Sequence, residues 1–553
     1  MKTWKTNLEE TKQRYINWWN HKGIILSMWE HFQEGVKPHA DIAPPAPARD
    51  LSQKWFDPQW RAEYLDWYVA HSSLMADMLP VANTQLGPGS LAAILGGVFE
   101  GGEDTIWIHP DPNFNDEIVF NPEHPNWLLH KELLKACKAK ANGNYFVGMP
   151  DLMEGLDVLA ALKGTDMVLL DTVMQSEVLE QQMQQINDIY FKVFDELYDI
   201  IREGDEMAFC YFSSWAPGKM SKLQSDISTM ISQDDYRRFV QPFIREQCQK
   251  IDYTLYHLDG VGAMHHLPAL LEIEELNAIQ WTPGVGEPQG GSPKWYDLYK
   301  KILAGGKSVM ACWVTLEELK PLLDHIGADG VHLEMDFHNE REVEQAMRII
   351  EEYTGSSSSV SADVHTNQPV GEQDNAQESI RIREEKSQEE DRMKPLYDAI
   401  VAGKLEPAVE VTKDAIAAGV LPQDIINGYM ITAMGEVGQR FQDGKAFVPQ
   451  LLMAGRAMKG ALELLKPLLA GNASATIGKI VIGTVKGDLH DIGKNLVASM
   501  LEGCGFEVIN IGIDVTCDKF VEAVKENKAD ILCMSALLTT TTVSYTHLTL
   551  PTT

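Results

Sequence analysis

Apolar runs of strand length alternate with amphipathic segments through the first 353 residues. Strands are predicted at 144–149, 206–212, 255–258, 278–281, 308–312 and 330–335. Helices are predicted at 154–162, 176–203 and 231–251, the last of them opened by the cap candidates Ser232 and Asp234. This alternation is typical of an α/β barrel, in which functional residues gather at the carboxyl ends of the strands.

The pattern changes after residue 353. Residues 354–391 contain a serine run and a highly charged stretch with little to bury, and they are predicted to form a flexible linker. Residues 393–469 have helical periodicity. Apolar, β-branched runs at 479–485, 506–511 and 530–534, with a helical stretch at 496–501, predict a parallel sheet.

A polar loop, residues 486–494, joins the first of these C-terminal strands to the helix after it. The loop contains Asp488-x-His490-x-x-Gly493 and lies where α/β sheets bind ligands. Asp488 and His490 can pair as carboxylate and imidazole, which fixes the tautomer and raises the basicity of the nitrogen that faces a metal. Gly493 lets the start of the helix approach a flat, bulky ligand closely. The alternative is a polar loop without a ligand.

This loop resembles that of the corrinoid-binding domain of cobalamin-dependent methyltransferases. The resemblance implies that His490 is the lower axial ligand of cobalt and that Asp488 hydrogen-bonds it. It also implies that Gly487, Asp491 and Gly493 belong to the cofactor-binding loop. Cobalamin, as cob(I)alamin and methylcobalamin, is the implied cofactor.

Two further stretches carry the same resemblance. Ser535-x-Leu537-x-Thr539 follows the third C-terminal strand and resembles the S-x-L-x-T beside the nucleotide tail of the cofactor. Residues 435–454 resemble part of the four-helix cap over the corrin ring, in which Phe447 and Leu451 would be cap contacts. For each of these two residues, ordinary bundle core is the alternative.

The first 353 residues resemble the uroporphyrinogen decarboxylase superfamily of TIM barrels. The resemblance is carried by residues 223–243, 256–260 and 281–286. True decarboxylases have an arginine-containing N-terminal stretch, whereas residues 24–31 here contain no arginine. The resemblance therefore implies the methyltransferase branch. Asp226 is a candidate catalytic residue, with a helix-capping or loop-bonding role as the alternative.

Thiol-methylating members of that branch bind zinc through His-x-Cys and a later Cys. Here His257-Leu-Asp259 stands in place of the first motif, Glu334-Met-Asp336 follows the last strand, and Cys312 lies one strand too early. The thiolate–zinc site is therefore altered or absent. His257, Asp259 and Glu334 are candidates for zinc binding through nitrogen and oxygen or for acid–base catalysis. Hydrogen-bonded residues without chemistry are the alternative.

Composition narrows the class of partner. The chain has 553 residues, 44% of them hydrophobic and 23% charged, as in soluble globular proteins. Its net charge of −33 argues against nucleic acid or an anionic membrane as partner. The seven cysteines are scattered without a C-x-x-C motif, and no signal core or spanning run is present, so a reducing, cytoplasmic location is expected.

These features predict an α/β protein with several domains. We expect a TIM (β/α)8 methyltransferase barrel at 1–353, a linker at 354–391, a four-helix cap at 392–470 and a partial doubly wound, Rossmann-like cobalamin-binding domain at 478–543. Such a domain has five strands, and only three fit here. Residues 544–553 are β-branched and polar and are expected to be a non-native tail. Because the last two strands and a Gly-Gly wall of the nucleotide pocket are missing, weak cobalamin binding is expected.

The expected function is corrinoid-dependent transfer of a methyl group from a small O- or N-methylated substrate to cob(I)alamin. A second methyltransferase and a corrinoid-reactivating protein are the implied partners, and the linker either lets the corrinoid domain reach them or is a passive joint. One alternative is a methylcorrinoid:thiol methyltransferase of the coenzyme M or homocysteine type. Another is a non-catalytic corrinoid carrier with a degenerate barrel.

Overall fold

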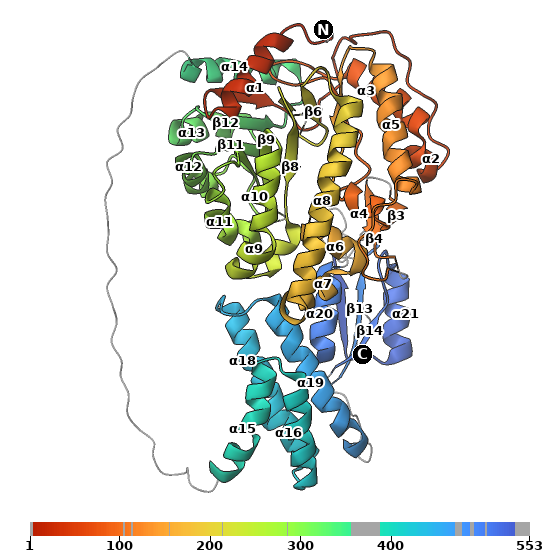
Figure 1. Cartoon of the computed structure of the whole chain (residues 1–553), viewed down its shortest axis with the longest axis vertical. Helices are drawn as coiled ribbons and strands as arrows, with labels where there is room; N and C mark the ends of the chain where they lie inside the picture. Colours follow the sequence, from red (N-terminus) through yellow and green to blue (C-terminus); the bar gives the residue numbers. More distant parts are fainter. Residues whose placement is uncertain are drawn as a thin grey trace, which may run out of the picture. The chain divides into compact units, whose positions relative to one another are not determined.

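The chain divides into two compact units, residues 1–356 and 357–553 (Figure 1). The structure, a computed structural model, describes residues 4–102, 105–111, 114–153, 155–212, 214–284, 286–354, 387–469, 478–486, 492–503 and 506–536. The division falls at the start of the predicted linker. Most of that linker, residues 355–386, lies outside the described residues.

Parallel strands form the framework of the N-terminal unit. Six strands pair in the order β1-β12-β11-β10-β9-β8, and four pair in the order β2-β5-β6-β7. All of these pairs are parallel except β6–β7, and β3–β4 is a separate antiparallel hairpin. The bounds are β1 Ile24–Ser27, β2 Val81–Ala82, β3 Val98–Gly101, β4 Ile106–His109, β5 Phe146–Met149, β6 Met207–Phe209, β7 Trp215–Ala216, β8 Met220–Leu223, β9 Tyr253–Asp259, β10 Ala278–Thr282, β11 Ser308–Val314 and β12 Val331–Met335.

Helices connect these strands. They are α1 Leu8–Trp19, α2 Leu51–Phe56, α3 Pro58–His71, α4 Ser90–Ile94, α5 Pro125–Ala141, α6 Gly155–Lys163, α7 Thr165–Met174, α8 Ser176–Ile201, α9 Gln233–Phe239, α10 Gln241–Lys250, α11 Leu267–Leu271, α12 Tyr296–Ala304, α13 Leu316–Ile326 and α14 Glu340–Thr354, with short 3₁₀ turns η1 Asp226–Met230, η2 Val261–His266 and η3 Pro293–Trp295. Their starts follow local sequence, as in α13, where Thr315 and Glu318 form a capping box. The predicted strands and helices agree with these elements apart from their ends, with one exception.

The exception is the single helix predicted at 231–251, which is wrong. Two helices, α9 and α10, meet at Val240. Pro242 lies in the first turn of α10, where its missing N–H has no intrahelical partner to lose. The predicted start is correct in one respect, because the Ser232 side chain accepts a hydrogen bond from the Asp235 N–H and caps α9.

A helical bundle begins the C-terminal unit. Its elements are α15 Ser387–Val401, α16 Leu405–Ala417, α17 Pro422–Ile425, the π-helical turn η4 Ile426–Met430, α18 Ile431–Gln442 and α19 Val448–Leu469. Leu396 and Ile400 of α15 pack in one apolar core with Met458 and Leu462 of α19. The bundle thus matches the predicted helical segment. α17, η4 and α18 follow one another without a break and form one continuous helical segment.

A three-stranded parallel sheet completes the described C-terminal unit. Its elements are β13 Lys479–Thr484, α20 Ile492–Gly503, β14 Glu507–Asn510, α21 Cys517–Asn527 and β15 Ile531–Ser535. The strand order is β14-β13-β15, so the first strand is central. None of the helices in the described part of the chain combines the length and the apolarity needed to cross a bilayer.

Candidate functional site

Four neighbouring parallel strands of the N-terminal unit bring polar side chains together near their carboxyl ends. His257 lies on β9, Gln280 on β10, Cys312 on β11 and Glu334 on β12. His257 and Gln280 are in direct register. All four side chains are buried, with Glu334 only 1% exposed. Since buried polar groups are stable only when they are hydrogen-bonded, their pairing decides what this layer can do.

The four side chains form one hydrogen-bonded chain. Gln280 Nε2 donates to Cys312 Sγ at 2.8 Å and to Thr282 Oγ1 at 2.7 Å. The amide oxygen of Gln280 therefore faces His257 Nδ1, with which it is hydrogen-bonded. Because that oxygen can only accept, Nδ1 carries the hydrogen, and His257 Nε2 is left as an acceptor. Nε2 faces Asp259, whose Oδ2 is 4.0 Å away.

Burial sets the protonation of this layer. Desolvation lowers the pKa of His257 to about 3, so the imidazole is neutral at pH 7. Desolvation also raises the pKa of Glu334 to about 8, although the thiol of Cys312 donates to its Oε2 at 2.9 Å. Glu334 is therefore mostly a neutral acid at pH 7. Its second oxygen, Oε1, is buried and has no hydrogen-bond partner among the described residues.

A second polar cluster lies on β8 and the segment after it. Lys222 Nζ is 2.5 Å from Asp151 Oδ2, and both side chains are at most 2% exposed. Lys222 also donates to Gln224, which in turn donates to Asp226 Oδ2 at 3.0 Å. Asp157 accepts the backbone N–H of Asp226 at 2.8 Å. The predicted residue Asp226 is thus joined through Gln224 to a buried lysine.

Neighbouring carboxyl groups perturb each other in this cluster. Burial raises the pKa of Asp157 to about 6, although two backbone N–H groups favour its charged form. Asp226 is exposed to solvent. Desolvation by the protein around it and the negative charges of Asp157 and Asp259 nevertheless raise the pKa of Asp226 well above its ordinary value. Burial also raises the pKa of Asp259. Several acids here therefore stay protonated above their usual range.

The structure brings together the predicted residues and others that the sequence did not single out. His257 and Asp259 share β9, while Glu334 joins them through Cys312 and Gln280. Lys222 and Asp151 were missed, because a lysine in a strand pattern gives no signal of burial until its partner, 71 residues away, is known. Within the described residues, no three His, Cys, Asp or Glu side chains gather closely enough to hold a metal ion.

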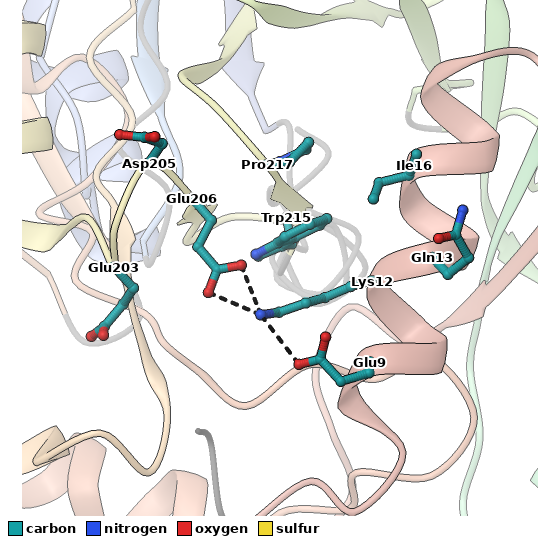
Figure 2. A pocket seen from close by; sticks show the side chains of 9 residues that line it. All are labelled: Glu9, Lys12, Gln13, Ile16, Glu203, Asp205, Glu206, Trp215 and Pro217. Atoms are coloured by element: carbon teal, nitrogen blue, oxygen red, sulfur yellow. Dashed lines mark hydrogen bonds and ion pairs between the residues drawn. The ribbon is translucent and has the colours of Figure 1, made fainter.

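A shallow groove in the same unit lies away from this cluster. It is lined by α1 and by the segments around β6 and β7, and Figure 2 shows Lys12 reaching between Glu206 and Glu9. Lys12 Nζ is 2.7 Å from Glu206 and 3.6 Å from Glu9, and it lies 5.5 Å from the Trp215 ring centroid. The groove borders the amino end of β8, whereas His257, Gln280, Cys312 and Glu334 lie near the carboxyl ends of their strands.

In the C-terminal unit, the central strand β13 ends at the predicted cofactor loop. Strand order reverses on the two sides of β13, and such a switch point leaves a ligand crevice outside the carboxyl ends. Thr484, fully buried at the end of β13, pairs with Ser535 at the end of β15. The predicted loop residues Gly487, Asp488, His490 and Asp491, with Leu537 and Thr539, lie outside the described residues. Gly493 lies in the first turn of α20.

The two predicted cap contacts lie at the start of α19. Phe447 is half-buried just before the helix, and its N–H donates to Gln450 Oε1 at 2.9 Å. Leu451 is buried in a small cluster with Val437, Ala446 and Ala454. The alternative of bundle core therefore describes the surroundings of Leu451 well, while Phe447 retains accessible surface.

The C-terminal unit is similar to known B12-binding domains. Residues 393–466 match a family model described as a B12 binding domain, and residues 478–549 match another with the same description. Trimethylamine corrinoid protein 1 of Methanosarcina mazei is 46% identical over 149 residues, which are 27% of this chain and 69% of that protein. The dimethylamine corrinoid protein of Methanosarcina barkeri is 43% identical over 153 residues, covering 28% and 71%.

Among solved structures, the methanol:cobalamin methyltransferase complex MtaBC from Methanosarcina barkeri matches 28% of this chain and 60% of its own at 33% identity. Its TM-score of 0.26 is too low to define the fold. A cobalamin-binding protein from Desulfitobacterium hafniense gives 35% identity over 28% of this chain and 72% of its own, with a TM-score of 0.24.

Sheet topology, bundle and matched ranges together define a B12-binding protein. Through its C-terminal unit, the chain belongs to the corrinoid protein family. Cobalamin is its cofactor, and the predicted corrinoid domain is confirmed.

Proposed function

We propose that the chain is a corrinoid-dependent methyltransferase whose N-terminal unit binds a small O- or N-methylated substrate. The observation that carries this proposal is the buried polar layer His257–Gln280–Cys312–Glu334, present in a chain that also belongs to the corrinoid protein family. A layer of this kind at the carboxyl ends of parallel strands suits chemistry on a small molecule. The names of the relatives, trimethylamine and dimethylamine corrinoid proteins, support methylated donors.

We also propose that the two sheets of the N-terminal unit are parts of one uroporphyrinogen-decarboxylase-like (β/α) barrel. Contacts on both sides support it. On one side, the Leu26 N–H of β1 donates to Asp77 Oδ2 at 3.0 Å, close before β2. On the other, the Met220 N–H of β8 lies 3.2 Å from Met207 Sδ of β6. Lys222 and Asp151 span the same boundary, since Asp151 follows β5.

The residues of the layer have distinct roles in this proposal. When bound, the corrinoid supplies the cobalt nucleophile that accepts the methyl group. Glu334, protonated at neutral pH, meets the heteroatom that loses the methyl group, and donates a proton where that atom is an oxygen. His257 Nε2 and Asp259 orient the donor, and Gln280 fixes the His257 tautomer. His490 would bind the cobalt of the corrinoid, and Asp488 would orient the His490 imidazole.

A second methyltransferase and a corrinoid-reactivating protein complete the proposal as partners. The test is a panel of O- and N-methylated donors, supplied to the full chain with chemically reduced cobalamin. Methylation of the cofactor is followed by its absorption spectrum. We expect transfer from at least one donor, and its loss in His257→Ala with cobalamin binding intact. If the wild-type chain demethylates no donor while it holds cobalamin, the non-catalytic carrier is the better description.

A further inference from the structure

Four aromatic rings form a wall at the carboxyl ends of the N-terminal strands. Trp29 follows β1, Tyr211 and Phe212 follow β6, and Trp313 lies near the end of β11. The Trp29 centroid is 4.4 Å from Tyr211, 4.9 Å from Phe212 and 5.4 Å from Trp313. Phe212 continues the wall to the His257 ring, at 5.8 Å. Trp29, Tyr211 and Trp313 are only half-buried, so part of each side chain is accessible to a ligand.

Trp313 holds an unusual backbone conformation to join this wall. Its φ is +53°, in the left-handed region that a bulky residue rarely adopts. The pairing of β11 with β12 is irregular between Ala311 and Val314, and such bulges re-aim a side chain. Backbone strain of this kind persists where surrounding structure enforces it, and it concentrates at binding sites. The position of the Trp313 ring is therefore a feature that the fold maintains at a cost.

Carboxyl groups surround the same wall. Besides burial, the charges of Asp151, Asp259, Asp226 and Glu334 all raise the pKa of the Tyr211 phenol, so these groups lie within electrostatic reach of that ring. Lys222 is the cation described nearby, 5.7 Å from the Tyr211 centroid, and Asp151 neutralises it. A ligand that satisfies both features has a positive charge and apolar substituents, because aromatic faces and carboxylates each attract cations.

We propose that this site selects a methylated ammonium cation, with Trp29, Tyr211 and Trp313 as its aromatic contacts and Asp259 and Glu334 as its counter-ions. This inference rests on the proposed function and names the substrate class. Demethylation of such a cation breaks one C–N bond and leaves the electron pair on nitrogen, so the amine departs neutral and needs no proton. The methyl group passes to the corrinoid. Glu334 then acts as a counter-ion, releasing its proton to bulk water when the cation binds.

A neutral aryl methyl ether is the competing ligand, since its ring also stacks on tryptophan. A neutral ether has no charge to pair with the carboxyl groups around Tyr211, which outnumber the lysine there. A cation gives them one, because it stabilises the ionised forms of Asp259 and Glu334, and Glu334 Oε1 has no other partner among the described residues.

The test compares choline with its neutral isostere 3,3-dimethylbutan-1-ol, and with methoxybenzene, by calorimetric titration of the full cobalamin-loaded chain. We expect choline to bind roughly 10- to 30-fold more tightly than the isostere. Trp29→Leu and Trp313→Leu should each weaken choline binding roughly 10-fold, while Trp29→Phe retains part of it. Trp60→Leu is the matched control, because Trp60 stacks on Tyr64 within helix α3. Circular dichroism checks that each variant folds.

Equal binding of choline and its isostere, or preference for methoxybenzene, overturns the inference. Methyl transfer to reduced cobalamin, measured with the same ligands, separates it from the proposed function. Methyl transfer from methoxybenzene without choline binding would support the proposed methyltransferase function and contradict the cation site. Choline binding with no transfer from any donor keeps the site and removes the function.

Discussion

Cys312 Sγ donates a hydrogen bond to Glu334 Oε2 at 2.9 Å, in a layer where both side chains are shielded from solvent. The two residues lie on adjacent strands β11 and β12. The contact occupies one carboxyl oxygen and leaves the other, Oε1, directed at no described partner. A buried acid with one unused oxygen can accept or release a proton as a ligand arrives.

Glu334→Gln is expected to lower kcat/KM for methyl transfer at least ~10-fold, because glutamine neither ionises nor donates an acidic proton. Steady-state kinetics distinguishes the two roles of Glu334. A rise in KM alone marks a counter-ion, whereas a fall in kcat with O-methyl donors marks a proton donor. Glu340→Gln on the exposed start of α14 is the control. Unchanged kinetics in Glu334→Gln would remove this residue from the site.

Glu334 also makes stability depend on pH. Its pKa is about 8 when folded and near 4.5 when unfolded, so between these values the folded chain holds a proton that the unfolded chain lacks. The free energy of unfolding that it contributes is therefore fully present below about pH 4.5 and is lost as pH rises towards 8. Because glutamine does not ionise, the wild type should lose stability relative to Glu334→Gln as pH rises over this range.

Tryptophan fluorescence measures this difference for the N-terminal unit alone, because all 13 tryptophans precede residue 354. Denaturant unfolding at several pH values between 5 and 8 gives the two curves. Asp157 and Asp259 also have raised pKa values, and both remain in the variant, so the comparison isolates Glu334. Parallel curves would contradict the assigned protonation.

Lys222→Met is expected to destabilise the N-terminal unit by about 3–5 kcal/mol, because it leaves the buried Asp151 carboxylate without its partner. The matched control is Lys219→Met. Lys219 pairs with Asp195 at 2.7 Å, but both side chains are partly exposed, so a loss of about 0–1 kcal/mol is expected. Urea unfolding followed by tryptophan fluorescence compares them. Equal losses would show that Lys222 is not paired as described.

His490→Ala is expected to abolish the base-off/His-on absorption signature of bound cobalamin, because it is the single imidazole of the predicted loop. His547→Ala, in the stretch predicted to have no functional role, is the control. Both variants are compared with wild type by absorption spectra after reconstitution. Persistence of histidine ligation in His490→Ala would contradict the axial assignment.

The sequence by itself determined the features that depend on neighbouring residues. The apolar run before Thr484 predicts a buried strand, and the helix after Gly493 follows it, which places a ligand loop between them whatever the rest of the chain does. Likewise, the hydroxyl of Ser232 predicts the start of a helix. Even the break at Val240 has a local cause, Pro242, which the helical periodicity around it concealed.

Only the tertiary structure decided the site of the N-terminal unit. His257, Gln280, Cys312 and Glu334 meet because four strands, each separated from the next by a helix, pair side by side in parallel. This pairing depends on long-range packing and cannot be predicted from the spacing of residues along the chain. For that reason Cys312, judged by the sequence alone, stood one strand too early to join His257 and Glu334. The left-handed φ of Trp313 likewise has no sequence signal. Trp313 keeps this conformation because packing around it outweighs the intrinsic preference of its backbone. That packing comes from residues distant in the sequence.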